Sequence, residues 1–168
     1  WDAQLIYPDN IFKSMVEWIF ETIDYFKNRK DIQLVIRAHP GEINYDRESK
    51  QKVKDEILKR YKKLPENIFV IGSENSISTY TFAGICEPLI IYATKMGMEF
   101  SPLGQTVICA GESYIKNKDI TMDPNTKEEY FKILDQIPFK EKLSEAKINR
   151  AKLYAYHFFF RRTIAPAV

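Results

Sequence analysis

The chain has 168 residues and a mass of 19.8 kDa, with 45% hydrophobic and 29% charged residues. That length supports one sizeable core, so we expect a single domain over residues 1–168. A net charge of +2 is too small to argue for nucleic acid as a partner. No apolar run reaches membrane-span length, and no signal peptide is visible. Cys86 and Cys109 match no metal-ligand spacing, which favours reduced core residues in a cytoplasmic protein.

Helical and strand patterns alternate along the chain. Residues 1–7 are typical of the end of a strand or of its exit loop, and Asp9 or Asn10 is expected to cap a helix over 11–26. A short, apolar run rich in β-branched side chains predicts a strand at 33–38, buried on both faces. Three more strands are predicted at 67–71, 89–93 and 106–110. Further helices are predicted at 47–61, from the 72–81 stretch to about 86, and at 97–103, 127–136 and 140–161.

Short apolar strands that alternate with helices are typical of βαβ units and a parallel sheet. We therefore predict an α/β fold, a Rossmann-like doubly wound parallel sheet with helices on both faces. In the helix predicted at 47–61, Val53, Ile57 and Leu58 are expected to face that sheet.

The 33–38 strand stops at His39-Pro40, where the proline should hold His39 extended with its ring pointing out of the sheet. Ligands of open α/β sheets bind beyond the carboxyl ends of the strands. Arg37 and His39 are therefore candidates for holding an anion. The alternative is that His39 only caps a neighbouring loop.

A second candidate loop, residues 73–79, follows the 67–71 strand and opens a helix. The free N–H groups of a helix start favour a phosphate, and the hydroxyls of Ser76, Ser78 and Thr79 could add hydrogen bonds. Plain N-capping, which needs only one of these hydroxyls, is the alternative.

A third candidate loop follows the 89–93 strand. Lys95 could meet a phosphate, Gly97 would permit close approach of the backbone to a ligand, and Glu99 could accept two ribose hydroxyls. The alternative for Glu99 is a solvated helix carboxylate. The sequence has no G-x-G-x-x-G, P-loop, zinc spacing or G-x-S-x-G, which disfavours dinucleotide oxidoreduction and P-loop hydrolysis and leaves no metal site to assign.

Three segments, VIRAHPGE, SENSISTYTFAG and TKMGMEFSPLGQTVICAGESYIKNKDIT, together resemble the carboxyl-terminal half of bacterial capsule (surface) polysaccharide biosynthesis proteins. These are glycosyltransferases of the two-domain GT-B type, and the resemblance covers nearly the whole chain, from WDAQL to YHFFFRR. It implies that residues 1–168 form the nucleotide-sugar-binding domain of a longer two-domain protein.

The resemblance also implies roles for the candidate residues. Similar motifs in bacterial sialyltransferases and Kdo transferases hold the nucleotide of a CMP-sugar, which makes a CMP-sugar the favoured donor. His39, posed by Pro40, would contact the donor phosphate together with Ser78 and Thr79. Gly97 and Glu99 resemble the pattern with which many GT-B enzymes hold the ribose.

The implied chemistry is inverting transfer of a sugar to a surface polysaccharide, with no cofactor besides the nucleotide-sugar donor. Protonated His39 and Arg37 would stabilise the leaving phosphate without a metal. The catalytic base and the site for a saccharide or lipid-linked acceptor are expected in the missing domain. This chain alone is therefore expected to bind nucleotide weakly and to transfer nothing.

Two other functions remain open. One is a CDP-glycerol glycerophosphotransferase of teichoic acid synthesis, whose His-Pro and Ser-rich loops are similar. The other is a non-catalytic Rossmann-like interaction module.

The last predicted helix carries aromatic residues from Tyr154 to Phe160, followed by Arg161 and Arg162. Such an end could lie on an anionic membrane surface, which would place the protein at the inner face of the membrane. We favour packing of these aromatics on the sheet or on the missing domain, because they surround the helix. His157 is interpreted as structural.

Overall fold

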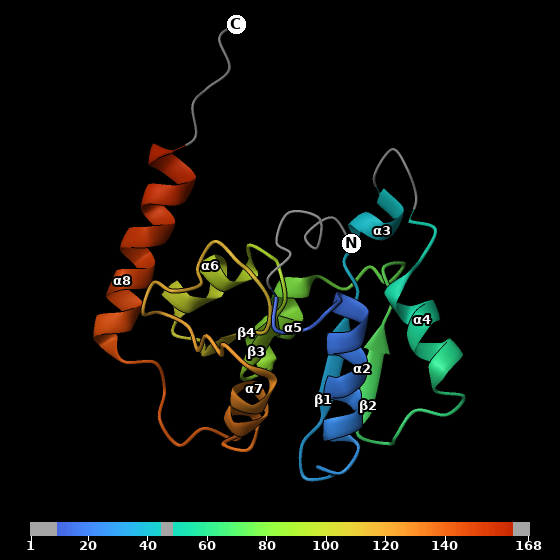
Figure 1. Cartoon of the computed structure of the whole chain (residues 1–168). Helices are drawn as coiled ribbons and strands as arrows, with labels where there is room; N and C mark the ends of the chain where they lie inside the picture. The colour runs from blue at the N-terminus through green and yellow to red at the C-terminus, as the bar shows by residue number, and fades with distance from the viewer. Residues whose placement is uncertain (1–9, 45–48, 163–168) are drawn as a thin grey trace, which may run out of the picture. The chain divides into compact units, whose positions relative to one another are not determined.

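The computed structural model describes residues 10–44 and 49–162. Within those residues the chain is a mixed α/β protein with seven α-helices and two parallel two-stranded sheets (Figure 1). The mixed α/β class predicted from the sequence is confirmed, but a doubly wound sheet is not shown, because the described strands form two separate pairs. The chain divides into two compact units, Ser14–Phe82 and a second made of Trp1–Lys13 with Ala83–Val168.

The unit Ser14–Phe82 contains a parallel pair of short strands. β1 (Leu34–Arg37) pairs with β2 (Ile68–Ile71), with Leu34 opposite Ile68 and Arg37 opposite Ile71. All four residues of β1 are half-buried, so the prediction that both faces of this strand are buried is wrong. Among the described residues β1 has one strand neighbour, β2, whereas a fully buried central strand has a neighbour on each edge.

α2 (Met15–Phe26) begins later than predicted. Ser14 caps it, and its Oγ accepts the backbone N–H of Glu17 at 2.9 Å. Asp9, one of the two predicted caps, lies outside the described residues. The same holds for the prediction at 1–7 and for residue 47, where the helix 47–61 was predicted to begin. Asn10 instead accepts the backbone N–H of Glu112 at 2.7 Å, so it cannot cap this helix.

The connection from β1 to β2 passes through α3 (Gly41–Asn44), which was not predicted, and α4 (Val53–Arg60). α4 is shorter than the predicted 47–61, because the Glu42 carboxylate accepts the N–H of Val53 at 3.0 Å and marks the helix start. Val53 and Ile57, one turn apart, are buried, whereas Leu58 is 46% exposed. The prediction for Leu58 is therefore wrong, because its side chain lies about 100° around the helix from Ile57. α2 and α4 lie beside the strand pair, and Arg60 joins them through Asp24 at 3.1 Å (Figure 1).

Asn67 fixes the connection between α2 and β1. Its side-chain amide donates to the carbonyls of Phe26 at 2.9 Å, Arg29 at 3.1 Å and Ile32 at 3.0 Å. Only 9% of the residue is exposed, so water cannot replace these bonds. One side chain thus ties together three carbonyls of the turn, and those of Phe26 and Arg29 also accept a backbone N–H within it.

Asn67→Ala should lower the free energy of unfolding of this unit by about 2 kcal/mol, because it removes the hydrogen bonds from one largely buried amide to three carbonyls of the turn. Urea unfolding followed by circular dichroism measures this. Asn28→Ala, which changes an exposed asparagine in the same turn, is the matched control and should cost much less. Equal losses in the two variants would contradict the role given to Asn67.

The second unit has its own parallel pair, β3 (Leu89–Ile91) and β4 (Val107–Cys109), with Ile90 opposite Ile108. Both strands are shorter than predicted. On the other side of β4, Met122 forms a single bridge, donating to the carbonyl of Val107 and accepting from the N–H of Cys109, each at 2.9 Å. α5 (Thr79–Ile85) carries the chain from the first unit into this one.

Between β3 and β4 the chain forms α6 (Met96–Phe100) and a 3₁₀ turn, η1 (Ser101–Leu103), which ends at Gly104 with φ of 91°. α7 (Lys127–Leu134) follows, capped by Thr126, whose hydroxyl accepts the N–H of Glu129 at 3.1 Å.

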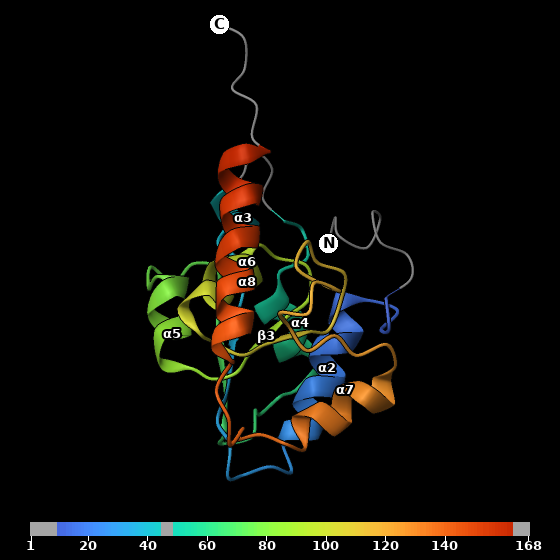
Figure 2. The same cartoon turned by 90° about the vertical axis from the view of Figure 1, so that its left-hand side faces the viewer.

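The predicted last helix, 140–161, consists of α8 (Glu145–Tyr156), capped by Ser144, and a π-helical segment, η2 (His157–Arg161). α8 packs against η1 and α6 (Figure 2). Its Ala151 joins a buried core with Ile91, Met98, Val107, Cys109, Ile115 and Ile120. Among the helices of residues 10–44 and 49–162, none combines the length and apolar character that a membrane span requires.

The two cysteines have different surroundings. Cys109 is fully buried in β4, and its burial, together with the charge of Asp123, raises the pKa of its thiol to about 12. Cys86 is only half-buried, so the expectation of two core cysteines holds for Cys109 alone. Burial raises the pKa of the Cys86 thiol as well.

In the native protein, an alkylating reagent should modify Cys86 first and Cys109 only after unfolding, because the thiolate is the reactive form. Raising the pH from neutral to mildly alkaline should speed modification of Cys86 and leave Cys109 slow, since its pKa of about 12 keeps it protonated. Peptide mass spectrometry after timed labelling measures both rates, and labelling in urea is the control. Fast native labelling of Cys109 would contradict its burial.

Candidate functional site

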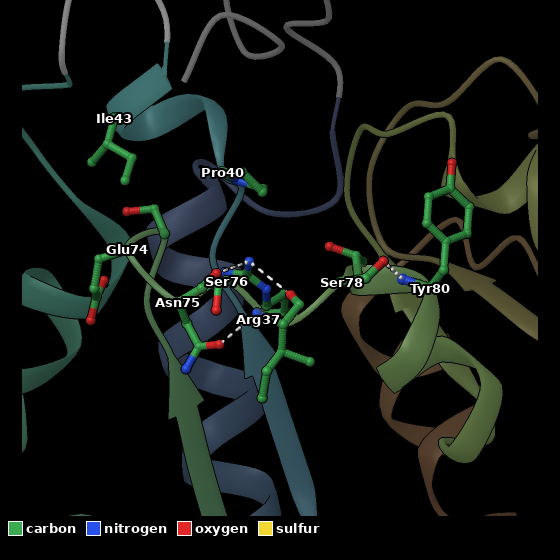
Figure 3. A pocket seen from close by; sticks show the side chains of 11 residues that line it. Arg37, Pro40, Ile43, Glu74, Asn75, Ser76, Ser78 and Tyr80 are labelled. Atoms are coloured by element: carbon green, nitrogen blue, oxygen red, sulfur yellow. Dashed lines mark hydrogen bonds between the residues drawn. The ribbon is translucent and has the colours of Figure 1, made fainter.

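A pocket of about 420 Å³ lies beyond the carboxyl ends of β1 and β2 (Figure 3). Parallel strands bring the residues that follow them to one edge, which is where ligands of α/β sheets bind. Of the residues predicted as ligands, the pocket is lined by Arg37, Pro40, Ser76, Ser78 and Thr79. Arg37 ends β1 and Pro40 follows it, whereas Ser76 and Ser78 lie in the loop after β2 and Thr79 begins α5.

Arg37, the last residue of β1, holds the loop after β2 in place. Its Nη1 donates to the carbonyls of Ala38 at 2.9 Å and Gly72 at 2.6 Å. Its Nη2 donates to the carbonyls of Asn75 at 2.9 Å and Ile77 at 3.4 Å (Figure 3). All four terminal N–H groups therefore have acceptors, and Nε is buried without one. In this arrangement Arg37 shapes the loop, and its exposed Nη2 already donates to loop carbonyls.

The charge of Arg37 is nevertheless not neutralised. Among the described residues it makes no ion pair, and its hydrogen-bond partners are neutral carbonyls. Glu74, which also lines the pocket, is paired with Lys54, whose hydrogen bond lowers the pKa of the Glu74 carboxyl. The charged side chains around this pocket thus leave one positive charge in excess, which favours an anion.

The three predicted hydroxyls have different roles. Ser78 Oγ accepts the N–H of Tyr80 at 3.2 Å, so Ser78 caps α5. Plain N-capping was the alternative to phosphate binding for this loop, and it needs one such hydroxyl. Within the described residues, the hydroxyls of Ser76 and Thr79 take part in no hydrogen bond. Ser76 is exposed and Thr79 is half-buried. These two hydroxyls can therefore bind a ligand without breaking an existing bond.

His39 is exposed and does not line the pocket. Its Nδ1 accepts the N–H of Gly41 at 2.9 Å, at the start of α3. This is the local capping that was the alternative to anion binding. The bond uses the lone pair of Nδ1 as its acceptor.

Lys95, Gly97 and Glu99 belong to the second unit and do not line this pocket. Lys95 is exposed at the N-cap of α6, and Glu99 is half-buried in its first turn. Gly97 has a packing role: a Cβ there would lie 2.8 Å from Ile91 Cδ1 and 3.0 Å from Ile115 Cγ2. Glycine at this position lets α6 approach the core of its unit, whether or not a ligand is present.

Gly97→Ala should destabilise the second unit by roughly 1–3 kcal/mol, because the added methyl group has to displace core side chains. Gly84→Ala is the matched control, since a Cβ at that helical glycine meets nothing within 4 Å. The control should be neutral or stabilising, because alanine is the better helix former. Thermal unfolding of the two variants side by side measures this. A neutral Gly97→Ala would contradict the packing role.

The pocket includes residues that were not predicted as ligands. Asn75 shapes the loop as well as lining it, because its Oδ1 accepts the N–H of Ile77 at 2.9 Å. The S-E-N-S run is a turn signal that could have indicated this. The other lining residues are Ile43, Ser73, Glu74, Ile77 and Tyr80. For Ile43 and Tyr80, no local pattern gives a reason to expect a ligand contact.

The described residues contain no group of three or more His, Cys, Asp or Glu side chains that could hold a metal ion. Comparisons with models of protein families, with curated proteins and with solved structures found no match to this chain. The geometry of the pocket is therefore the evidence on which a function is proposed.

Proposed function

We propose that the chain is the donor-binding half of a GT-B glycosyltransferase with a Rossmann-like sheet, acting in synthesis of a capsular or other surface polysaccharide. The pocket beside Arg37 binds the phosphate of the nucleotide-sugar donor. The observation that carries this proposal is the positive charge of Arg37, whose hydrogen-bond partners among the described residues are neutral carbonyls. Beside it, at the carboxyl ends of two parallel strands, lie the hydroxyls of Ser76 and Thr79, which make no hydrogen bond within the same residues. On the resemblance of the motifs, a CMP-sugar is the favoured donor.

Each part of the pocket suits a phosphate in a different way. Arg37 attracts the anion through its charge and positions the loop, without donating to the ligand. The hydroxyls of Ser76 and Thr79 donate to phosphate oxygens, and bonds to a charged group are stronger than bonds between neutral groups. His39 stays a predicted phosphate ligand, through the N–H of Nε2. Lys95 and Glu99 also stay predicted ligands of the nucleotide, but they do not line this pocket, so its geometry does not test them.

The proposed reaction breaks the bond between the sugar and the donor phosphate. Negative charge develops on the leaving phosphate, and fixed positive charge and donors lower the energy of that state. The residues named here stabilise the leaving group only. The base that deprotonates the acceptor hydroxyl, and the acceptor site itself, are assigned to a further part of a longer protein.

Titration calorimetry with CMP, CDP, UDP and GDP tests the proposal. One nucleotide should bind, and Thr79→Val should weaken it about three- to tenfold, because a hydrogen bond worth about 1 kcal/mol is lost. Thr81→Val is the matched control, since Thr81 lies on the same helix, is exposed and does not line the pocket. It should leave the affinity unchanged.

Two further titrations decide the roles of phosphate and of His39. Cytidine should bind much more weakly than CMP if the pocket holds the phosphate. His39→Ala should cost roughly tenfold or more if Nε2 donates to that phosphate, and little if the ring only caps α3. Absence of binding at millimolar nucleotide, or equal losses in Thr79→Val and Thr81→Val, would overturn the proposed site.

A further inference from the structure

α8 and η2 form one continuous coil (Figure 1). Apolar residues lie on two of its sides. One side faces the core of its unit: Ala151 is buried, and Tyr154, Phe158 and Phe159 pack against the core cluster. This explains why the aromatics surround the helix in sequence. Packing on the core accounts for three of the five tyrosine and phenylalanine residues between Tyr154 and Phe160.

The other side carries Leu153, Tyr156 and Phe160, which we call the outer stripe. They are 71%, 57% and 74% exposed. Their spacing of three and four residues places them in one row, and the rings of Tyr156 and Phe160 stack at 5.6 Å. Large apolar side chains gathered in one exposed row mark an interaction surface more often than isolated ones do.

The segment that carries the outer stripe has charged side chains of one sign. From Ala146 to the end of the sequence there are five basic residues and no acidic one. Lys147 and Arg150 pair with Asp119. Lys152, Arg161 and Arg162 are exposed, and within the described residues they make no ion pair.

We propose that the outer stripe and these three basic residues bind the surface of a membrane that contains anionic lipids. Leucine, tyrosine and phenylalanine enter the boundary between headgroups and acyl chains, and lysine and arginine side chains reach back to the lipid phosphates. The coil lies on the surface, because it lacks the length and apolar character of a span. This inference does not depend on the nucleotide pocket, which lies in the other unit.

A second copy of the chain fits this surface less well. A symmetric contact through the outer stripe would bring the unpaired Lys152, Arg161 and Arg162 of one copy close to the same residues of the other. Like charges facing each other oppose such a contact. An anionic surface provides the complementary charge as well as an apolar phase.

Sedimentation of the full chain with lipid vesicles tests the proposal. The chain should bind vesicles of phosphatidylcholine mixed with phosphatidylglycerol and not vesicles of phosphatidylcholine alone. Arg161→Glu with Arg162→Glu should reduce binding more than about twentyfold, because each basic residue near an anionic surface contributes about fivefold. Lys62→Glu with Lys63→Glu makes the same charge change at exposed residues elsewhere and is the matched control.

A second pair of variants tests the apolar part. Leu153→Ser with Phe160→Ser should reduce vesicle binding more than tenfold, whereas Ile85→Ser, at a residue 78% exposed on α5, should not. Circular dichroism checks that each variant is folded. The proposal is overturned if both charge variants lose binding equally, or if the two lipid mixtures bind alike. It is also overturned if light scattering shows a dimer that Phe160→Ser dissociates.

Discussion

The contact between the Arg37 guanidinium and four backbone carbonyls determines the shape of the candidate site. Three of these carbonyls belong to the loop after β2, from Gly72 to Ile77, and the fourth is that of Ala38. An irregular loop has few backbone bonds of its own, so one cation with several donors can decide its conformation. The pocket, the exposed hydroxyl of Ser76 and the start of α5 all follow from this contact.

The sequence indicated the loops of the site better than the roles of its residues. β1 and β2 were predictable because short β-branched runs end at clear breakers, and parallel strands place the following loops together. The role of Arg37 was not predictable, because its partners lie 35–40 residues further along the chain. Gly97 shows the same limit: a glycine needed for core packing and a glycine needed beside a ligand look alike in one sequence.

Helix starts were the least predictable part of the fold. Asp9, Asn10 and Ser14 all have side chains that can cap a helix, so local chemistry does not choose among them. Phe12 favours Ser14 as the cap, because it is only 1% exposed and packs edge-on against Tyr130, with ring centroids 5.2 Å apart, before α2 begins. α4 is similar, since Glu42, eleven residues before Val53, marks its start. Both decisions depend on contacts between separated residues, which periodicity does not contain.

The peptide plane gives the Arg37 contact one more effect. In a trans peptide, the C=O and the following N–H point in opposite directions. The cis bonds among the described residues are Glu87-Pro88 and Ile137-Pro138, so the peptides of this loop are trans. Carbonyls turned toward Arg37 at Gly72, Asn75 and Ile77 therefore turn the next amides, those of Ser73, Ser76 and Ser78, away from it. The guanidinium thus orients a row of backbone dipoles whose positive ends point outward, and an arginine that touches no ligand can still present donors to one.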